Sequence, residues 1–191
     1  MATHPPQPFT ASADQPVLRT ARLLLRPFAP GDAAVLTAAI SDERVARQTL
    51  SVPHPYPTGA AEEFIACCAE EWGAGKAVTW AITRREEGTV IGAIAIRVVR
   101  AHHRGEVGYW LAVPAWGQGI MTEAVGTVVA YGFDTLALHR LEARIFPGNA
   151  ASARVLEKSG FMREGTLRGA VWRENAPRDV VRYAQLVSDP R

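Results

Sequence analysis

The stretch YWLAVPAWGQGIMTEAV, from Tyr109 to Val125, decides the fold of this chain. An apolar run ends at Pro114, glycines follow at Gly117 and Gly119, and the residues after them have helical spacing. A strand that enters a helix in this way leaves the first helical amides unpaired and directed at one point, where the helix dipole favours negative charge. Glycine lets a ligand oxygen reach those amides because no Cβ blocks the approach. The stretch therefore predicts a phosphate site.

The predicted donors to this phosphate are backbone amides at the start of the helix. They belong to Gly117, Gln118, Gly119, Ile120, Met121 and Thr122.

Other interpretations of the turn compete with this one. A Walker loop needs Lys and then Ser or Thr after its last glycine, and Ile120 and Met121 stand there instead. A dinucleotide fingerprint needs a third glycine where Thr122 stands; that alternative predicts binding of NAD. An ordinary strand-to-helix turn, tight but without a ligand, is the third alternative.

Strand and helix patterns extend outward from this stretch and predict an α+β fold. Three apolar segments, two of them upstream, are joined by links short enough only for hairpins, so they predict an antiparallel meander. Helix signals include Thr58 as a cap, Glu62 and Glu63 in the first turns that follow it, and Asn149 as a cap farther on. The expected strands are 18–28, 77–85, 89–99, 106–113, 140–146 and a closing hairpin over 162–187, and the expected helices begin near residues 30, 60, 121 and 149.

Composition limits the class of protein. The 191 residues predict a flexible tail over 1–16 and one domain over 17–188, and 48% apolar residues suffice for a core. A formal net charge of +2 argues against a nucleic-acid partner. The N-terminus does not resemble a signal peptide, and no apolar run reaches about 20 residues, so we expect no membrane span and a cytoplasmic location. Cys67 and Cys68 predict two reduced thiols, and the histidine spacing predicts no metal site.

The opening stretch resembles the acetyl-CoA signature of the GNAT superfamily of N-acetyltransferases, in the form found in its RimJ/RimL-like branch. Further segments resemble the same branch in the same order over residues 17–187: ARLLLRPF, VIGAIAI, GEVGYWL, NAASARVLEKSGF, REGTLRGAVW and RDVVRYAQL. The resemblance implies the GNAT fold: a twisted, mainly antiparallel sheet that splays between its fourth and fifth strands, flanked by about four helices.

The resemblance also implies how acetyl-CoA binds. Its pyrophosphate would lie on the amides from Gly117 to Thr122, and its extended pantetheine arm would pair with a strand edge. The backbone of Leu111, Ala112 and Val113 would contact the pantetheine and the acetyl group. Asn149 would bond the arm through its side chain, or would cap the helix that follows it.

The catalytic candidates are Glu106 and Ser152. Glu106 matches the glutamate of the branch and would act as a base or hold a water; the alternative is a solvated strand-end carboxylate, and Glu142 is a second candidate. Ser152 would contact the cofactor and protonate the departing thiolate; the alternative is an ordinary serine in the first turn of a helix. The tyrosine that acts as general acid in many relatives is Leu156 here, and Trp116 stands where arginine or glutamine is usual.

The resemblance implies transfer of an acetyl group from acetyl-CoA to a primary amine, by direct attack in a ternary complex. A protein N-terminus, such as that of a ribosomal protein, is the favoured acceptor. An α-amine, with a pKa of about 8, costs roughly 3 kcal/mol less to deprotonate at neutral pH than a lysine at about 10.4. A small-molecule amine, including an antibiotic, and a non-catalytic module that senses acyl-CoA or binds a partner are the alternatives. A homodimer is compatible with the sequence.

Overall fold

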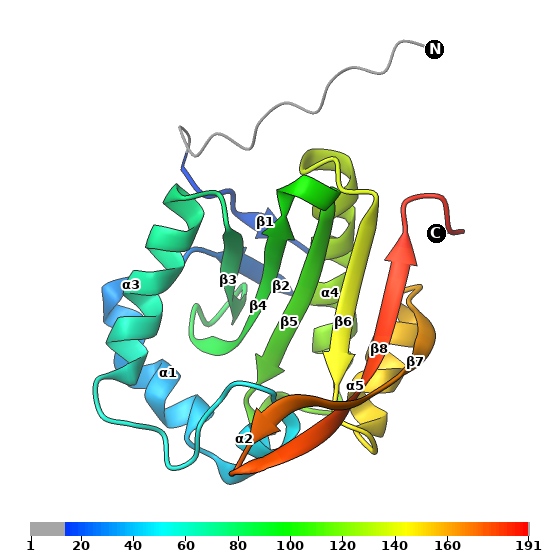
Figure 1. Cartoon of the computed structure of the whole chain (residues 1–191). Helices are drawn as coiled ribbons and strands as arrows, with labels where there is room; N and C mark the ends of the chain where they lie inside the picture. The colour runs from blue at the N-terminus through cyan, green and yellow to red at the C-terminus, as the bar shows by residue number, and fades with distance from the viewer. Residues whose placement is uncertain (1–13, 191) are drawn as a thin grey trace.

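Eight strands form one mixed sheet in the computed structural model, which describes residues 14–190 (Figure 1). The strand order is β1-β2-β3-β4-β5-β6-β8-β7, and every neighbouring pair is antiparallel except β5 with β6. The strands are β1 (Leu18–Arg19), β2 (Leu23–Arg26), β3 (Ala77–Arg84), β4 (Val90–Val99), β5 (Arg104–Leu111), β6 (Arg140–Ile145), β7 (Met162–Arg173) and β8 (Ala176–Leu186). The predicted meander is confirmed as β3, β4 and β5, and the predicted closing hairpin as β7 and β8.

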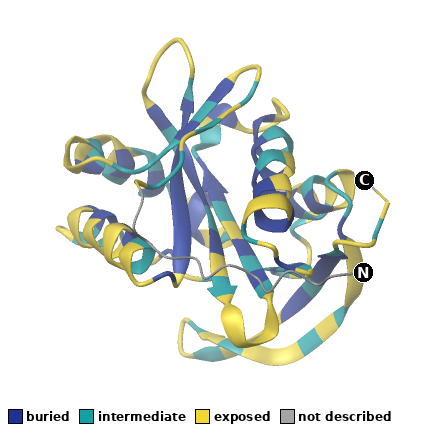
Figure 2. Ribbon diagram, turned by 90° about the horizontal axis from the view of Figure 1, so that it is seen from above, coloured by how far each residue is buried: buried dark blue, intermediate teal, exposed yellow. Residues whose placement is uncertain are grey.

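Helices cover both faces of the sheet. One face carries α1 (Ala33–Ile40) and α3 (Ala60–Gly73), and the other carries α4 (Ile120–Ala130) and α5 (Ala150–Lys158), as Figure 1 shows. In Figure 2, seen from above, the central strands and the inward helix faces are buried, while the outer helix faces and much of β7 are exposed. The described residues hold a further helix, α2 (Glu43–Gln48), where the sequence predicted about four. Asp42 begins α2 by accepting a hydrogen bond from the amide of Arg44.

Two expectations for the N-terminal half are wrong. The single strand expected over 18–28 is divided into β1 and β2, because the Thr20 hydroxyl accepts a hydrogen bond from the Leu23 amide at 2.8 Å and closes a turn. Thr58 does not cap α3. The N-cap is Gly59, which has a left-handed backbone with φ of +79°, although Glu62 and Glu63 lie in the first turn as expected.

The predicted tail lies mostly outside the described residues, which begin at Asp14. The first described residues are hydrogen-bonded to β3. Gln15 Nε2 donates to the Thr79 carbonyl at 2.7 Å, and Trp80 Nε1 donates to the Pro16 carbonyl at 2.8 Å. Both bonds hold this segment against a central strand.

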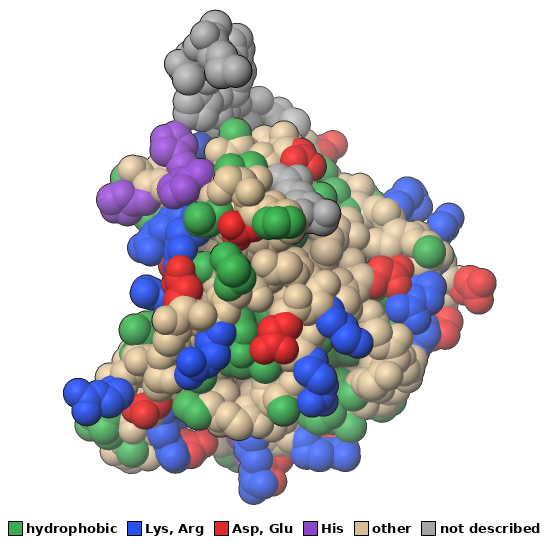
Figure 3. Space-filling model, turned by 90° about the vertical axis from the view of Figure 1, so that its right-hand side faces the viewer, with side chains coloured by type: hydrophobic (Ala, Val, Ile, Leu, Met, Phe, Trp, Pro, Cys, Tyr) green, Lys and Arg blue, Asp and Glu red, His purple; other side chains and the backbone are tan. Residues whose placement is uncertain are grey.

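Surface charges of both signs are interspersed on the molecule. In Figure 3, arginine, lysine and acidic side chains alternate over the face that carries β7 and β8. The two free cysteines differ in environment: Cys67 is exposed, whereas burial raises the pKa of Cys68 to about 12, so its thiol stays protonated.

We expect Asp32→Asn to destabilise the fold. The Asp32 carboxylate accepts two hydrogen bonds from Arg26, at 2.7 and 2.8 Å, and one from the Ala29 amide, and the Arg26 bonds lower the pKa of Asp32. Loss of this partly buried pair should lower the free energy of unfolding by about 1–3 kcal/mol at pH 7. Because the folded-state pKa is depressed, the wild type loses this stability as the pH falls through that pKa, below 3.8, and the difference from the variant should shrink.

Urea unfolding at pH 7 and at acid pH measures both effects. Glu43→Gln is the control, since its pair with Arg47 is exposed and should contribute little. An Asp32→Asn deficit that stays constant with pH would contradict the assignment.

Candidate active site

The parallel strands β5 and β6 pair over a short stretch and then separate, as the family resemblance implied. The ladder joins Arg104 to Arg140, Gly105 to Leu141 and Glu106 to Glu142. Within residues 14–190 the two strands form no further pairs, although β5 continues to Leu111 and β6 to Ile145 (Figure 1). The edge of β5 after Glu106 therefore offers backbone groups to an extended ligand.

The glycine turn at the start of α4 has the geometry that requires glycine. Gly117 and Gly119 have φ of +74° and +72°, in the left-handed region that other residues avoid. Gly119 is the N-cap of α4 and has no side chain with which to cap the first amides. A Cβ on Gly117 would meet nothing within 4 Å among the described residues, and one on Gly119 would meet only Arg22 Nη2 at 3.7 Å. The turn is open to a ligand oxygen.

Two arginines hold this turn in place: Arg22, directly before β2, and Arg84 on β3. Arg22 donates to the Gln118 carbonyl at 3.0 Å, and Arg84 donates to the Gln118 side chain at 2.7 Å. Arg22 also pairs at 2.6 Å with Glu123, the acidic residue in the first turn of α4. Burial raises the pKa of Glu123, but hydrogen bonds from Thr20 and Arg22 outweigh it and lower that pKa overall. Glu123 is thus a charge already compensated, which reduces its repulsion of a phosphate.

The predicted donors of the turn contribute through the backbone. The side chains of Ile120 and Met121 are buried in the core, at 1% and 7% exposure, and Gln118 Nε2 of the side chain donates to the Pro114 carbonyl at 2.8 Å. These three side chains are therefore occupied within the protein, and the groups left for a ligand are the backbone amides. Thr122 is half-buried.

The segment expected to contact pantetheine is already hydrogen-bonded in part. The Leu111 carbonyl accepts from Trp116 Nε1 at 2.7 Å, the Ala112 amide donates to the Ile91 carbonyl at 2.8 Å, and the Val113 carbonyl accepts from the Trp116 amide at 3.1 Å. A carbonyl has a second lone pair, so Leu111 and Val113 can each accept one more bond. Trp116 fixes the path by which the chain leaves β5.

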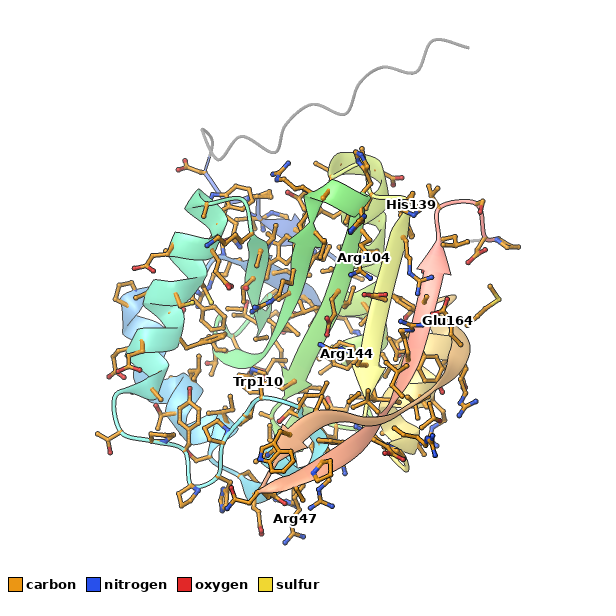
Figure 4. All side chains as sticks on the ribbon, in the orientation of Figure 1. Arg47, Arg104, Trp110, His139, Arg144 and Glu164 are labelled. Carbon is orange, nitrogen blue, oxygen red and sulfur yellow. The ribbon has the colours of Figure 1, made fainter. Side chains whose placement is uncertain are left out.

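The two candidate carboxylates face each other across the ladder, and arginines neutralise both. Arg144 donates to Glu106 from Nε at 2.9 Å and from Nη2 at 2.8 and 3.0 Å. Glu142 pairs with Arg104 at 3.1 Å and with Arg140 at 3.3 Å. Without these partners the adjacent carboxylates would repel each other. Figure 4 shows Arg104 on β5 at the paired end of the ladder and Arg144 on β6 toward the end where the strands separate.

A second polar group lies at the start of α5. The Asn149 side chain accepts from the Ser152 amide at 3.0 Å, which confirms the predicted cap. The Ser152 hydroxyl lies 2.7 Å from the hydroxyl of Tyr109 on β5. Burial raises the pKa of Tyr109 to about 12. Leu156 is fully buried in the core, so this position provides packing where many relatives have a tyrosine.

A groove of about 340 Å³ lies between the proline-rich loop and the tip of the β7–β8 hairpin. Trp172, 73% exposed, lines it from β7, and His54 lines it from the loop. Arg173 joins its two sides because its guanidinium donates to the carbonyls of Ala46, Thr49 and Val52. An acceptor could occupy this groove beside the proline-rich loop.

In the part of the chain that the structure describes, no cluster of three His, Cys, Asp or Glu side chains is placed to hold a metal ion. Across residues 14–190, no helix has both the length and the apolar character needed to cross a membrane.

Comparison with known proteins identifies the family. The model of the acetyltransferase (GNAT) domain matches residues 22–162. The uncharacterized N-acetyltransferase YoaA of Bacillus subtilis is 33% identical over 170 residues, which cover 88% of this chain and 96% of that protein. The ribosomal-protein-serine acetyltransferase of Escherichia coli is 30% identical over 103 residues, which cover 53% of this chain and 58% of that protein.

Among solved structures, the RimL ribosomal L7/L12 alpha-N-protein acetyltransferase in complex with coenzyme A superposes with a TM-score of 0.81. The match covers 90% of this chain and 98% of that one, and at 19% identity it shows the shared fold alone. The chain belongs to the GNAT acetyltransferase family, and the sheet that opens between β5 and β6 is the GNAT fold. The protein is an N-acetyltransferase that takes its acetyl group from acetyl-CoA.

We expect Gly119→Ala to weaken binding of acetyl-CoA. A side chain at φ of +72° costs about 1–2 kcal/mol, so the turn should shift and move the amides that are predicted to bind the pyrophosphate. The Kd measured by isothermal titration calorimetry should rise about tenfold. Gly126→Ala is the control in the same helix, since a Cβ there meets nothing within 4 Å among the described residues and its φ is not in the left-handed region. Equal affinity of both variants would count against the phosphate site.

Proposed function

We propose that this acetyltransferase acetylates the α-amine of a protein or peptide N-terminus, with a ribosomal protein as the favoured acceptor. The observation that carries the proposal is a pair of groups where β5 leaves β6. Glu106 lies at the last pair of the ladder, and Ser152 on α5 is hydrogen-bonded to Tyr109, which follows on β5. The named ribosomal-protein acetyltransferases among its relatives support the acceptor class.

In this mechanism the amine attacks the thioester directly while both substrates are bound. The amides of the α4 turn hold the pyrophosphate, and the edge of β5 holds the pantetheine arm. Arg144 fixes the Glu106 carboxylate, whose remaining lone pairs hold a water or the amine and receive its proton. Ser152 protonates the thiolate as the carbon–sulfur bond breaks. An α-amine needs only a modest base because much of it is neutral near pH 7.5.

The groove beside the proline-rich loop provides a place for the acceptor chain. Its walls combine apolar residues with polar and charged ones, and Trp172 is exposed near the tip of the hairpin. An exposed aromatic ring offers a large contact area to a peptide at low conformational cost. Arg173 keeps the two walls together.

The first experiment follows thiol release from acetyl-CoA in the presence of N-terminal peptides, free small amines and aminoglycosides. We expect release with peptides, and a kcat at least tenfold lower for Glu106→Gln with the Kd for acetyl-CoA unchanged. Glu142→Gln is the matched control on the neighbouring strand; a larger loss there would transfer the role of base to Glu142. Release only with small amines would refute the acceptor class, and tight binding without release would indicate an acyl-CoA sensor.

We also expect Trp172→Ala to raise the KM for the peptide about fivefold to tenfold, because a large contact surface is lost, while the KM for acetyl-CoA stays the same. Steady-state kinetics with each substrate varied in turn gives both values. Met162→Ala removes an exposed apolar side chain from the other end of the same strand and is the control. Equal effects of the two substitutions would place the acceptor elsewhere.

A further inference from the structure

Tyr109 places a hydroxyl beside the proposed proton donor. It comes from the part of β5 that has separated from β6, and its oxygen lies 2.7 Å from Ser152 Oγ. The bond joins a strand to α5, across 43 positions of sequence. Tyr109 packs against the core that contains α4, and Ser152 is 8% exposed, so the pair is shielded from bulk solvent.

The direction of this hydrogen bond determines what Ser152 can do. A serine hydroxyl has one proton and two acceptor lone pairs. If the serine donates to Tyr109, its proton is not available to another group. If Tyr109 donates, the serine proton is free to point at a second acceptor. A phenol is a stronger acid than an aliphatic alcohol, and the raised pKa of Tyr109 keeps that phenol protonated at neutral pH, so donation by Tyr109 is favoured.

A hydrogen bond in the first turn of α5 already fixes the backbone of Ser152. Its amide donates to the Asn149 side chain in the first turn of α5, which leaves the side-chain torsion as its main freedom. A hydrogen bond from Tyr109 removes that freedom and selects one orientation of the hydroxyl. The turn that follows offers no substitute, because Leu156 is apolar and fully buried.

We propose that Tyr109 is a positioning residue for the departure of coenzyme A: it donates to Ser152 Oγ and directs the serine proton at the thioester sulfur. The inference rests on the proposed role of Ser152. The amine nitrogen forms its bond to the carbonyl carbon, and the carbon–sulfur bond breaks with its electron pair on sulfur. The Ser152 proton passes to sulfur. Glu106 takes the proton lost by the amine and returns it through water, which restores the serine. Tyr109 keeps its own proton and stabilises the serine oxygen as negative charge develops there.

The test compares Tyr109→Phe, Ser152→Ala and the double variant with acetyl-CoA. Tyr109→Phe should lower kcat about tenfold, and its KM for acetyl-CoA should stay within about twofold of the wild-type value. The double variant should be no slower than Ser152→Ala, because both changes interrupt one interaction. Tyr131→Phe is the matched control: it removes a hydroxyl from a buried tyrosine that packs on Trp80, and it should leave kcat unchanged.

A second readout separates proton donation from packing. The acetyl thioester of 4-nitrothiophenol has an acidic leaving group that departs without a proton, so its kcat/KM should fall less than twofold in Tyr109→Phe and Ser152→Ala. A loss in Tyr109→Phe that is equal for both thioesters, or that adds to the loss in Ser152→Ala, would overturn the inference. A normal kcat for Ser152→Ala would refute the proposed function of Ser152 itself. A normal kcat for Tyr109→Phe beside a slow Ser152→Ala would refute only the role of Tyr109.

Discussion

The short parallel ladder between β5 and β6 is the constraint on which the site depends. Two parallel strands cannot be joined by a hairpin, so the chain must cross over from the end of β5 to the start of β6, and α4 makes this connection. The crossover places the N-terminus of α4, with Gly117 and Gly119, next to the end of β5. Because the ladder stops at Glu106, the open strand edge and the glycine turn proposed to bind phosphate lie at the same end of the sheet. One ligand that is both extended and charged can use the two together.

Where the sheet opens, carboxylates as well as backbone groups are exposed, and arginines pair with these carboxylates. Glu106 and Glu142 are neighbours at the last pair of the ladder, where two bare carboxylates would push the strands apart. Arg144 and Arg140 from β6, with Arg104 from β5, bind them instead. The same guanidinium that stabilises the end of the ladder also fixes the orientation of Glu106. The Arg144–Glu106 pair therefore both stabilises the point where β5 and β6 separate and orients a catalytic candidate.

Local signals made part of this structure predictable. The glycines of the turn, the Asn149 cap and the hairpin links act over a few residues, and each is present as expected. The missed contacts of the site depend on partners far away in sequence: the Glu106–Arg144 pair spans 38 positions, and the bond from Arg173 to the Val52 carbonyl spans 121. The order of the strands in the sheet brings such partners together, and no local sequence pattern predicts that order. Helix α2 was missed for a different reason, since its six residues carry too little apolar periodicity.

Successive side chains of β5 point to opposite faces of the sheet, so the candidate site has groups on both faces. Glu106 and Trp110 share one face, and Trp110 packs into the cluster with α1. Tyr109 points to the opposite face, where α4 and α5 lie. A group that handles the amine and a group that handles the thiolate can therefore work from opposite faces of the same opening, with the thioester between them. In the proposed mechanism this separation favours direct transfer, because the amine and the leaving thiolate would occupy different sides and neither would have to depart before the other arrives.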